Sequence, residues 1–176
     1  DFEYLISEIE KSSIKKIIFI SSTSVYPLNN SITTEDSPVH KTDLSKIEQL
    51  FRVNTNFKTT IIRFGGLIGF DRKPGKFFKK ETVIDRPKGY VNLIHRDDCI
   101  QIINCIITNN IWEETLNACS DSHPTRRDFY TKEFLKEGRN TPIFNESSSN
   151  SYKIISSNRL KLLLNYSFKY ANLMEY

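Results

Sequence analysis

The sequence lacks long hydrophobic runs and stretches of one charge. Its apolar runs, such as residues 17–20, are far shorter than the roughly 20 residues that a membrane-spanning helix needs. The 176 residues carry a net charge of +4, and the lysines and arginines are scattered along the chain. We therefore expect neither a membrane nor a nucleic acid as a partner. Because the first residues are acidic where a secretory signal is basic, the cytoplasm is the expected compartment.

Cysteine and methionine are also scarce. The three cysteines, Cys99, Cys105 and Cys119, are an odd number and form no C-x-x-C pair. This pattern argues against a disulfide framework and a metal site. We therefore expect the three cysteines to be buried and to act as small hydrophobic side chains. The chain begins at Asp1 and its single methionine is Met174. We therefore expect that a native start lies upstream.

What is present is a regular alternation of two periodicities. Apolar residues at helical spacing or in short runs predict the following elements: helices over 2–12, 42–54, 98–107, 125–137 and 158–164, and strands over 16–20, 59–64, 90–94 and 115–119. Asp97 or Asp98 is expected to cap the third helix, Thr125 the fourth and Ser157 the last. Such alternation predicts a parallel sheet covered on both faces, hence an α/β fold.

Hydroxyl groups gather where the first predicted strand ends. The apolar run 17–20 is followed at once by Ser21, Ser22, Thr23 and Ser24. In open parallel α/β sheets, ligands bind beyond the carboxyl ends of the strands, so these hydroxyls could reach a ligand. Serine and threonine also cap turns at strand ends, and the spacing alone leaves both interpretations open.

Several motifs in this order resemble one family. The segments are S-S-T-S-V-Y at 21–26, R-F-G-G-L-I-G at 63–69, V-N-L-I-H-R-D-D at 91–98 and S-S-N-R-L at 156–160. Together they resemble the C-terminal part of an extended short-chain dehydrogenase/reductase of the NAD(P)-dependent sugar epimerase/dehydratase family. The resemblance implies a Rossmann-like, doubly wound parallel sheet that is incomplete, with the later strands only, and a small C-terminal substrate-side lobe. Residues 1–176 would be one portion of a domain, with 1–64 as sheet core and 65–176 as mixed core and lobe.

Two departures from the family pattern affect the chemistry. The G-x-G-x-x-G turn that cradles a dinucleotide's pyrophosphate is absent from the sequence. The family's Tyr-x-x-x-Lys pair also lacks its tyrosine. If Lys46 is the lysine, Thr42 takes the tyrosine position; in the other register His40 takes it, and Leu44 takes the lysine position.

The resemblance assigns candidate roles to ten residues. Catalytic candidates are Ser22, Ser24, His40 and Lys46; candidates for binding NAD or NADP are Ser21, Phe64, Gly65 and Gly66; candidates for binding substrate are Arg63 and His95. Several have structural alternatives. Arg63 could pair with a buried carboxylate, Lys46 fits an exposed helix face, and His95 could support the start of the next helix.

The implied activity is epimerase, dehydratase or reductase chemistry with NAD or NADP on a nucleotide sugar or similar hydroxylated metabolite. The expected partner is therefore a small, sugar-like molecule, and a homodimer is compatible with the sequence. Two alternatives stay open. One is a non-catalytic sensor or scaffold that binds NAD(P) or a metabolite, and the other is a degenerate fragment that needs a separate N-terminal half.

Overall fold

Three parallel strands form the main sheet of the computed structural model, which describes residues 2–79 and 81–176. Their order is β1 (Lys16–Ser22), β3 (Lys58–Phe64), β7 (Thr115–Ala118), and β1 pairs with β3 from Lys16 opposite Lys58 to Ser22 opposite Phe64. The central strand β3 is buried from its second residue onward. The apolar run 17–20 predicts that its own strand is buried on both faces; this is wrong, because β1 is the last strand in the sheet order and is only partly buried, with Ile20 exposed. All three carboxyl ends therefore lie at one edge of the sheet.

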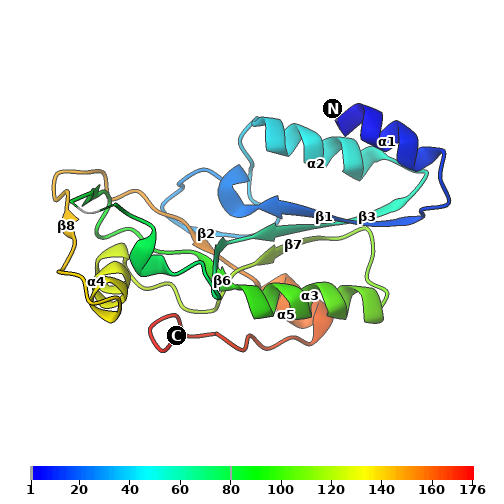
Figure 1. Ribbon diagram of the computed structural model, residues 1–176. Helices are drawn as coiled ribbons and strands as arrows, with labels where there is room; N and C mark the ends of the chain where they lie inside the picture. The colour runs from blue at the N-terminus through cyan, green and yellow to red at the C-terminus, as the bar shows by residue number, and fades with distance from the viewer. Residues whose placement is uncertain (1, 80) are drawn as a thin grey trace.

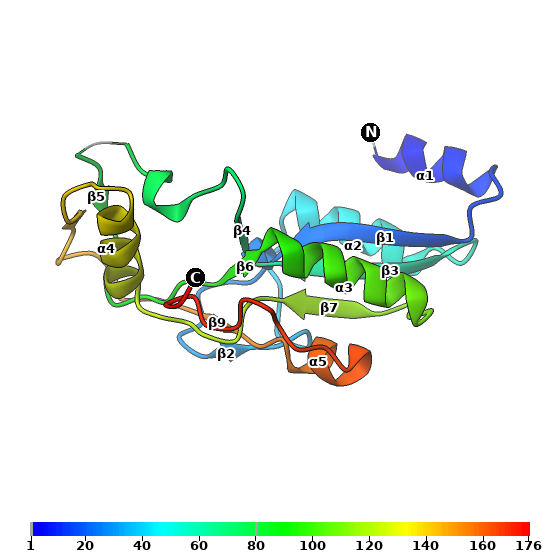
Figure 2. The same cartoon turned by 60° about the horizontal axis from the view of Figure 1, so that its bottom comes forward.

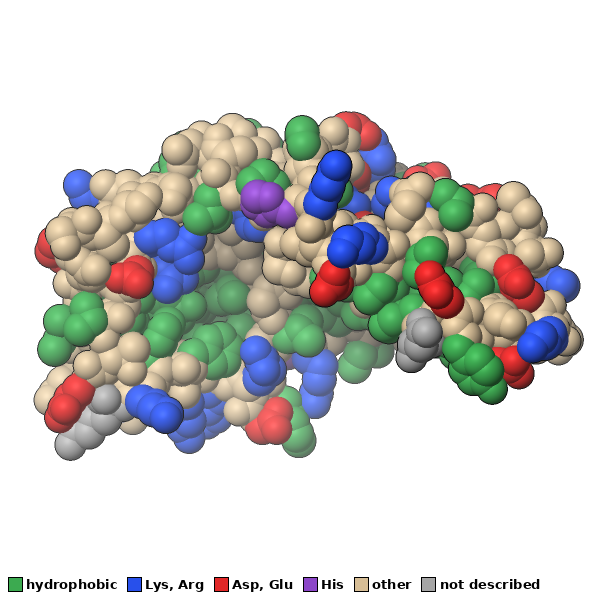
Figure 3. All heavy atoms as spheres, turned by 90° about the horizontal axis from the view of Figure 1, so that it is seen from above, with side chains coloured by type: hydrophobic (Ala, Val, Ile, Leu, Met, Phe, Trp, Pro, Cys, Tyr) green, Lys and Arg blue, Asp and Glu red, His purple; other side chains and the backbone are tan. Residues whose placement is uncertain are grey.

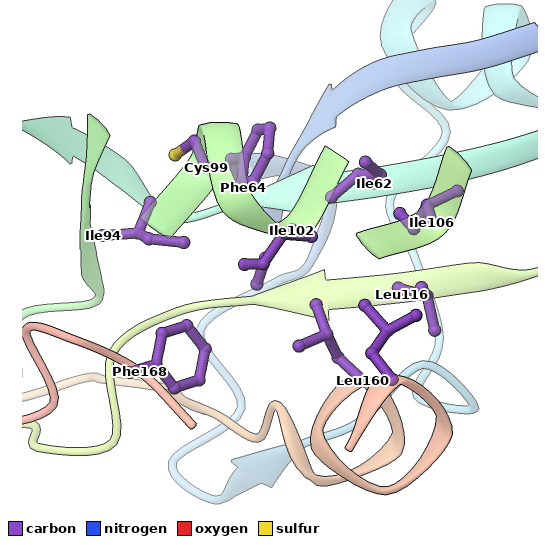
Figure 4. Close-up of a cluster of buried hydrophobic side chains, with 11 residues drawn as sticks. Ile62, Phe64, Ile94, Cys99, Ile102, Ile106, Leu116, Leu160 and Phe168 are labelled. Carbon is purple, nitrogen blue, oxygen red and sulfur yellow. The ribbon is translucent and has the colours of Figure 1, made fainter. Parts of the chain in front are cut away.

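Helices cover both faces of this sheet (Figure 1). On one face lie α1 (Phe2–Glu10) and α2 (Asp43–Val53), and on the other lie α3 (Arg96–Thr108) and α5 (Asn158–Leu164). The side chains between the sheet and the second helix pair form a large hydrophobic cluster, which Figure 4 shows in part. Ile62, Ile102 and Leu116 are fully buried there. The predicted covered parallel sheet is confirmed.

A smaller lobe lies beyond the carboxyl ends of the strands (Figure 2). It contains the 3₁₀ turn Pro74–Lys76, β5 (Val83–Ile84), α4 (Arg126–Lys136) and β8 (Ile143–Phe144). Its own hydrophobic cluster includes Phe129 and Phe134.

Two further pairs of short strands lie between the sheet and the lobe. They are β4 (Gly66–Ile68) with β6 (Leu93–His95), and β2 (Ile32–Thr33) with β9 (Ile154–Ile155). Both pairs are parallel and join segments that are distant in the sequence.

The helix starts agree only partly with the predicted caps. The Thr125 hydroxyl accepts a hydrogen bond from the Asp128 N–H at 3.1 Å, as predicted. The prediction for α3 is wrong, because His95 is the cap and its Nδ1 accepts from the Asp97 N–H at 3.1 Å. Ser157 begins α5 without a side-chain cap, since its hydroxyl bonds instead to the backbone of Cys119.

The three cysteines are free, and Cys99 and Cys119 are buried, as predicted. Burial raises the pKa of the Cys99 thiol to about 12, so both the position and the chemistry of this residue are those of a small apolar side chain. Within 2–79 and 81–176, no helix combines the length and apolarity needed to cross a membrane. The same residues contain no cluster of three or more metal-ligating side chains.

Candidate functional site

A cavity of about 370 Å³ lies between the end of β1 and the lobe. It is lined by residues from both sides, including Ser22, Ser24 and Gly66 from the sheet side and Arg126 and Lys153 from the lobe side. We call it the cleft. In the view from above, the surface is hollowed between the lobe and the sheet core, with hydrophobic side chains inside the hollow and lysines and arginines at its margin (Figure 3).

Ser22 caps a turn and also lies at the cleft. Its hydroxyl caps the 3₁₀ turn Thr23–Val25 by accepting from the Ser24 N–H at 3.1 Å, and it also lines the cleft. The cap occupies one lone pair, so the hydroxyl proton and the second lone pair stay available to a ligand. Ser24 also lines the cleft, and its side chain is exposed.

A chain of hydrogen bonds ties the cleft walls together. The Gly66 N–H donates to the Asn92 carbonyl at 2.8 Å. The Asn92 amide donates to the Lys153 carbonyl at 2.9 Å and accepts from the Ile155 N–H at 2.8 Å. The asparagine of the V-N-L-I-H motif therefore positions the segment that carries Lys153.

Lys153 closes this chain on the turn after Ser22. Its ammonium donates to the carbonyls of Thr23 at 2.8 Å and Tyr26 at 2.6 Å. Burial, and then the charge of Arg86, lower the pKa of Lys153 below its usual value. The cleft thus holds a half-buried cation that donates to two neutral carbonyl oxygens.

Arg63 and Ser21 belong to a different, buried network. The Arg63 guanidinium donates to both carboxylate oxygens of Glu48, at 2.9 and 2.5 Å, and the Ser21 hydroxyl donates to Glu48 at 2.5 Å. Arg63 also donates to the Tyr26 hydroxyl at 2.6 Å, which in turn donates to Asn117 at 2.9 Å. Arg63 therefore pairs with a buried carboxylate, which is the structural alternative that the sequence left open. Neither Arg63 nor Ser21 lines the cleft.

The glycines after β3 have a packing role as well as a place beside the cleft. A Cβ at Gly65 would meet the Asn92 carbonyl at 2.9 Å, and one at Gly66 would meet the Leu93 side chain at 2.7 Å. Gly65 is buried and Gly66 is exposed in the cleft, whereas Phe64 lies in the main hydrophobic cluster. Of the predicted cofactor contacts, only Gly66 lines the cleft.

The remaining predicted residues lie outside the cleft. His40 is exposed in the loop before α2, and Lys46 is exposed and pairs with Asp43 at 2.9 Å. His95 is buried at the start of α3 with its ring 3.7 Å from that of Tyr170. Lys46 and His95 thus have the structural environments that the sequence left open as alternatives: an exposed helix face and the start of a helix. The proposed site therefore does not include Lys46, His95, His40, Ser21 or Arg63.

All three cationic residues that line the cleft were absent from the sequence candidates: Arg86, Arg126 and Lys153. Arg126 is the first residue of α4, within the helix that the sequence predicts over 125–137, and its half-buried side chain also lines the cleft. Arg86 and Lys153 belong to no motif, and no sequence signal points to them.

The residues of the cleft fit one end of a dinucleotide only. Gly66 has no side chain at the cleft, so its backbone is open to close approach by a flat ring, and the Ser22 hydroxyl is near. The chain offers no G-x-G-x-x-G turn for the pyrophosphate. The fit is therefore to the nicotinamide end.

No family model matches the chain. The chain is 32% identical to the protein YeeZ of Escherichia coli K12 over 163 residues, which are 89% of this chain and 59% of YeeZ. It thus spans about 59% of the length of the curated relatives that it matches.

Solved structures resemble the whole chain. A functionally unknown conserved protein from Silicibacter pomeroyi DSS superposes with a TM-score of 0.84 at 19% identity, over 98% of this chain and 68% of that one. The UDP-glucuronic acid 4-epimerase from Bacillus cereus, solved with NAD, gives 0.76 at 18% identity over 98% and 62%. A putative NAD-dependent epimerase/dehydratase from Methylobacillus flagellatus gives 0.75 at 21% identity over 99% and 67%. The chain therefore has the fold that these NAD-dependent epimerase and dehydratase structures share, and the resemblance carried by its sequence motifs is confirmed at the level of the fold.

Proposed function

We propose that this chain forms the substrate side of an NAD(P)-dependent epimerase-, dehydratase- or reductase-like protein that acts on a nucleotide sugar or similar hydroxylated metabolite. One observation carries the proposal. Ser22, Ser24 and Gly66 line the same cleft, just where the parallel strands β1 and β3 end, and α/β sheets bind ligands at the carboxyl ends of their strands.

The residues of the chain would bind and orient the substrate. When bound, a nicotinamide would supply the accepting or donating centre for a hydride. The Ser22 hydroxyl would hydrogen-bond a substrate oxygen, and the bonds from Lys153 to the Thr23 and Tyr26 carbonyls would keep the following turn in place. Preorganised hydrogen bonds of this kind favour one geometry of the reacting centre.

A non-catalytic sensor is the second candidate, and a specific observation favours it. Neither register of α2 supplies a tyrosine, and Lys46 is exposed and paired with Asp43. The tyrosines that line the cleft, among them Tyr90 and Tyr152, come from other segments. A protein of this kind would bind a nicotinamide cofactor or a metabolite without turnover.

Replacing Ser22 by alanine tests the proposal. In an assay of nicotinamide oxidation or reduction with nucleotide sugars and other sugar-like substrates, we expect S22A to lose at least about 100-fold in kcat/KM. Its melting temperature should fall only by the small amount expected for one lost cap.

The matched control is Ser13→Ala, because Ser13 is exposed and lies before the first residue of β1, whereas Ser22 is the last residue of that strand. It should retain full turnover. Binding of a cofactor or sugar without turnover in the wild type would favour the sensor, and equal turnover in S22A and wild type would contradict the role of Ser22.

A further inference from the structure

We infer that the cleft binds a small, hydroxylated ligand with a carboxylate or phosphate group, held by Arg86, Arg126 and Lys153 beside the Ser22 hydroxyl. The inference rests on the proposed function for the hydroxylated part of the ligand and adds its charge and size. The shared chemistry of the two groups is that of a compact oxyanion.

The charge lining the cleft has one sign. Three cationic side chains line it, and none of its lining residues is aspartate or glutamate. Among the residues that the structure describes, none of the three takes part in an ion pair, although the charge of the Asp85 carboxylate acts on Arg126 at longer range. Most other buried or half-buried cations of this chain do have a carboxylate partner, as Arg63 has Glu48.

The polar contacts of these cations are to neutral oxygens. Lys153 donates to two carbonyls. Arg126 donates through Nε to the Asp85 carbonyl at 2.9 Å, and its guanidinium lies 5.3 Å from the centre of the Tyr130 ring. The Asp85 carboxylate itself accepts from the Asn145 amide at 2.9 Å. The positive charges are thus positioned by dipoles and a ring rather than neutralised.

The three cations also repel one another. Burial is the largest cause of the lowered pKa of Arg126 and Lys153, and the charge of Arg86 lowers both pKa values further. For Arg126, Tyr130 and the charge of Asp85 act in the opposite direction without cancelling the shift. An oxyanion among them would relieve both the repulsion and the incomplete solvation, and guanidinium groups match the geometry of carboxylate and phosphate oxygens.

Size and position make the expected ligand small. A cavity of about 370 Å³ is near the lower end of the range for small-molecule sites. Lys153 is bonded to Thr23, the residue after Ser22, so the oxyanion and the group that contacts Ser22 lie within one short molecule. The rings of Tyr90 and Tyr152, edge to face at 5.0 Å, add an apolar wall suited to the C–H face of a sugar. A sugar acid or sugar phosphate meets these requirements, whereas a nucleotide sugar is much longer.

Calorimetric titration of the chain without cofactor tests the inference. The ligands are glucose, gluconate, glucose 6-phosphate and UDP-glucose, at low and high salt. We expect gluconate or glucose 6-phosphate to bind at least about tenfold more tightly than glucose, with affinity falling as salt rises. The comparison of the two anions shows which oxyanion the cleft prefers.

The decisive variant is Arg86→Met, because within residues 2–79 and 81–176 no hydrogen bond or ion pair uses the Arg86 side chain. The backbone N–H of Arg86 donates to the Ser148 hydroxyl and its carbonyl accepts from the Gly89 N–H, and the substitution leaves both bonds in place. It should keep the wild-type melting temperature and bind the preferred anion at least about tenfold more weakly. Lys153→Met should weaken binding as well, but it also removes two bonds to carbonyls. The matched control is Lys58→Met, whose ammonium pairs with Glu113 on the surface and which should bind as the wild type does.

Three results would overturn the inference: equal affinity for glucose and both anions, unchanged anion binding in R86M, or tightest binding of UDP-glucose. None of these depends on nicotinamide binding or turnover. Anion binding with no Ser22-dependent turnover would retain the inference and remove the catalytic proposal, so the two fail separately.

Discussion

The buried ion pair between Glu48 and Arg63 gives the sharpest prediction about stability. The Glu48 side chain is 1% exposed and that of Arg63 is 3% exposed, and two hydrogen bonds join them. In the variant Glu48→Gln, the Arg63 guanidinium keeps its charge but loses its counter-charge in a site without access to water. The hydroxyl of Ser21 loses a charged acceptor as well.

The expected cost is about 3 kcal/mol in the free energy of unfolding. Removing one partner of a buried pair typically costs roughly 3–5 kcal/mol, and glutamine retains one carbonyl acceptor, so the lower end applies. Because domains are stable by roughly 5–15 kcal/mol, E48Q should lose a large share of its stability yet remain folded in water. Equilibrium unfolding in urea, followed by far-ultraviolet circular dichroism and linear extrapolation, measures the change.

Two variants make the measurement specific. Glu8→Gln removes an exposed carboxylate that pairs with Lys11, and it should change the unfolding free energy by less than about 0.5 kcal/mol. The double variant Glu48→Leu/Arg63→Met removes both charges and should be more stable than E48Q, because no unpaired charge is left buried. A loss of less than about 1 kcal/mol in E48Q would refute the assignment of this pair as a structural anchor.

Two further predictions concern groups outside the cleft. Burial lowers the pKa of His95 and His123, so the unfolded chain binds more protons than the folded one and the unfolding free energy should fall as the pH drops below about 6.5. Urea unfolding at about pH 7.5 and at about pH 5.5 measures the change in unfolding free energy between the two pH values. Replacing both histidines by asparagine should remove most of this change. An equally large change in the double variant would contradict the role of the two histidines. Asp98 accepts hydrogen bonds from the Tyr166 hydroxyl at 2.7 Å and from the backbone N–H groups of Lys169 and Tyr170, and so holds the C-terminal segment 166–170 in place. Asp98→Asn should therefore speed proteolysis within 166–170, whereas the surface variant Asp121→Asn should not. Equal proteolysis rates in the two variants would argue against this role of Asp98.

The sheet core was predictable because its signals are local. The apolar run at 17–20 and the mostly buried strand 59–64 are visible in the sequence and become β1 and β3 with ends shifted by one or two residues. The short parallel pairs were not predicted. In β2 and β9, Ile32 lies opposite Ile154, and two-residue strands so far apart in the chain show no periodicity that could reveal their pairing.

The candidate site was predicted in part for the same reason. Ser22 and Gly66 follow directly from strand ends and motifs, and both line the cleft. Arg63 also ends a strand, but its environment depends on Glu48 from a helix, which sequence spacing does not show. Lys153 reaches the cleft only because Asn92 holds its backbone across the fold, and this contact is purely tertiary.

The position of β1 in the sheet links its architecture to the cleft. Among the described residues, β1 pairs with β3 on one edge only, and its Ile20 is 49% exposed. The backbone groups on its other edge are a template for strand addition, and hydrogen exchange there should be faster than on the edge that faces β3. An added strand would hold β1 on both sides up to its last residue, Ser22. Addition of a strand and ordering of the hydroxyl that we propose binds the ligand would then be one coupled equilibrium, in which each makes the other more favourable.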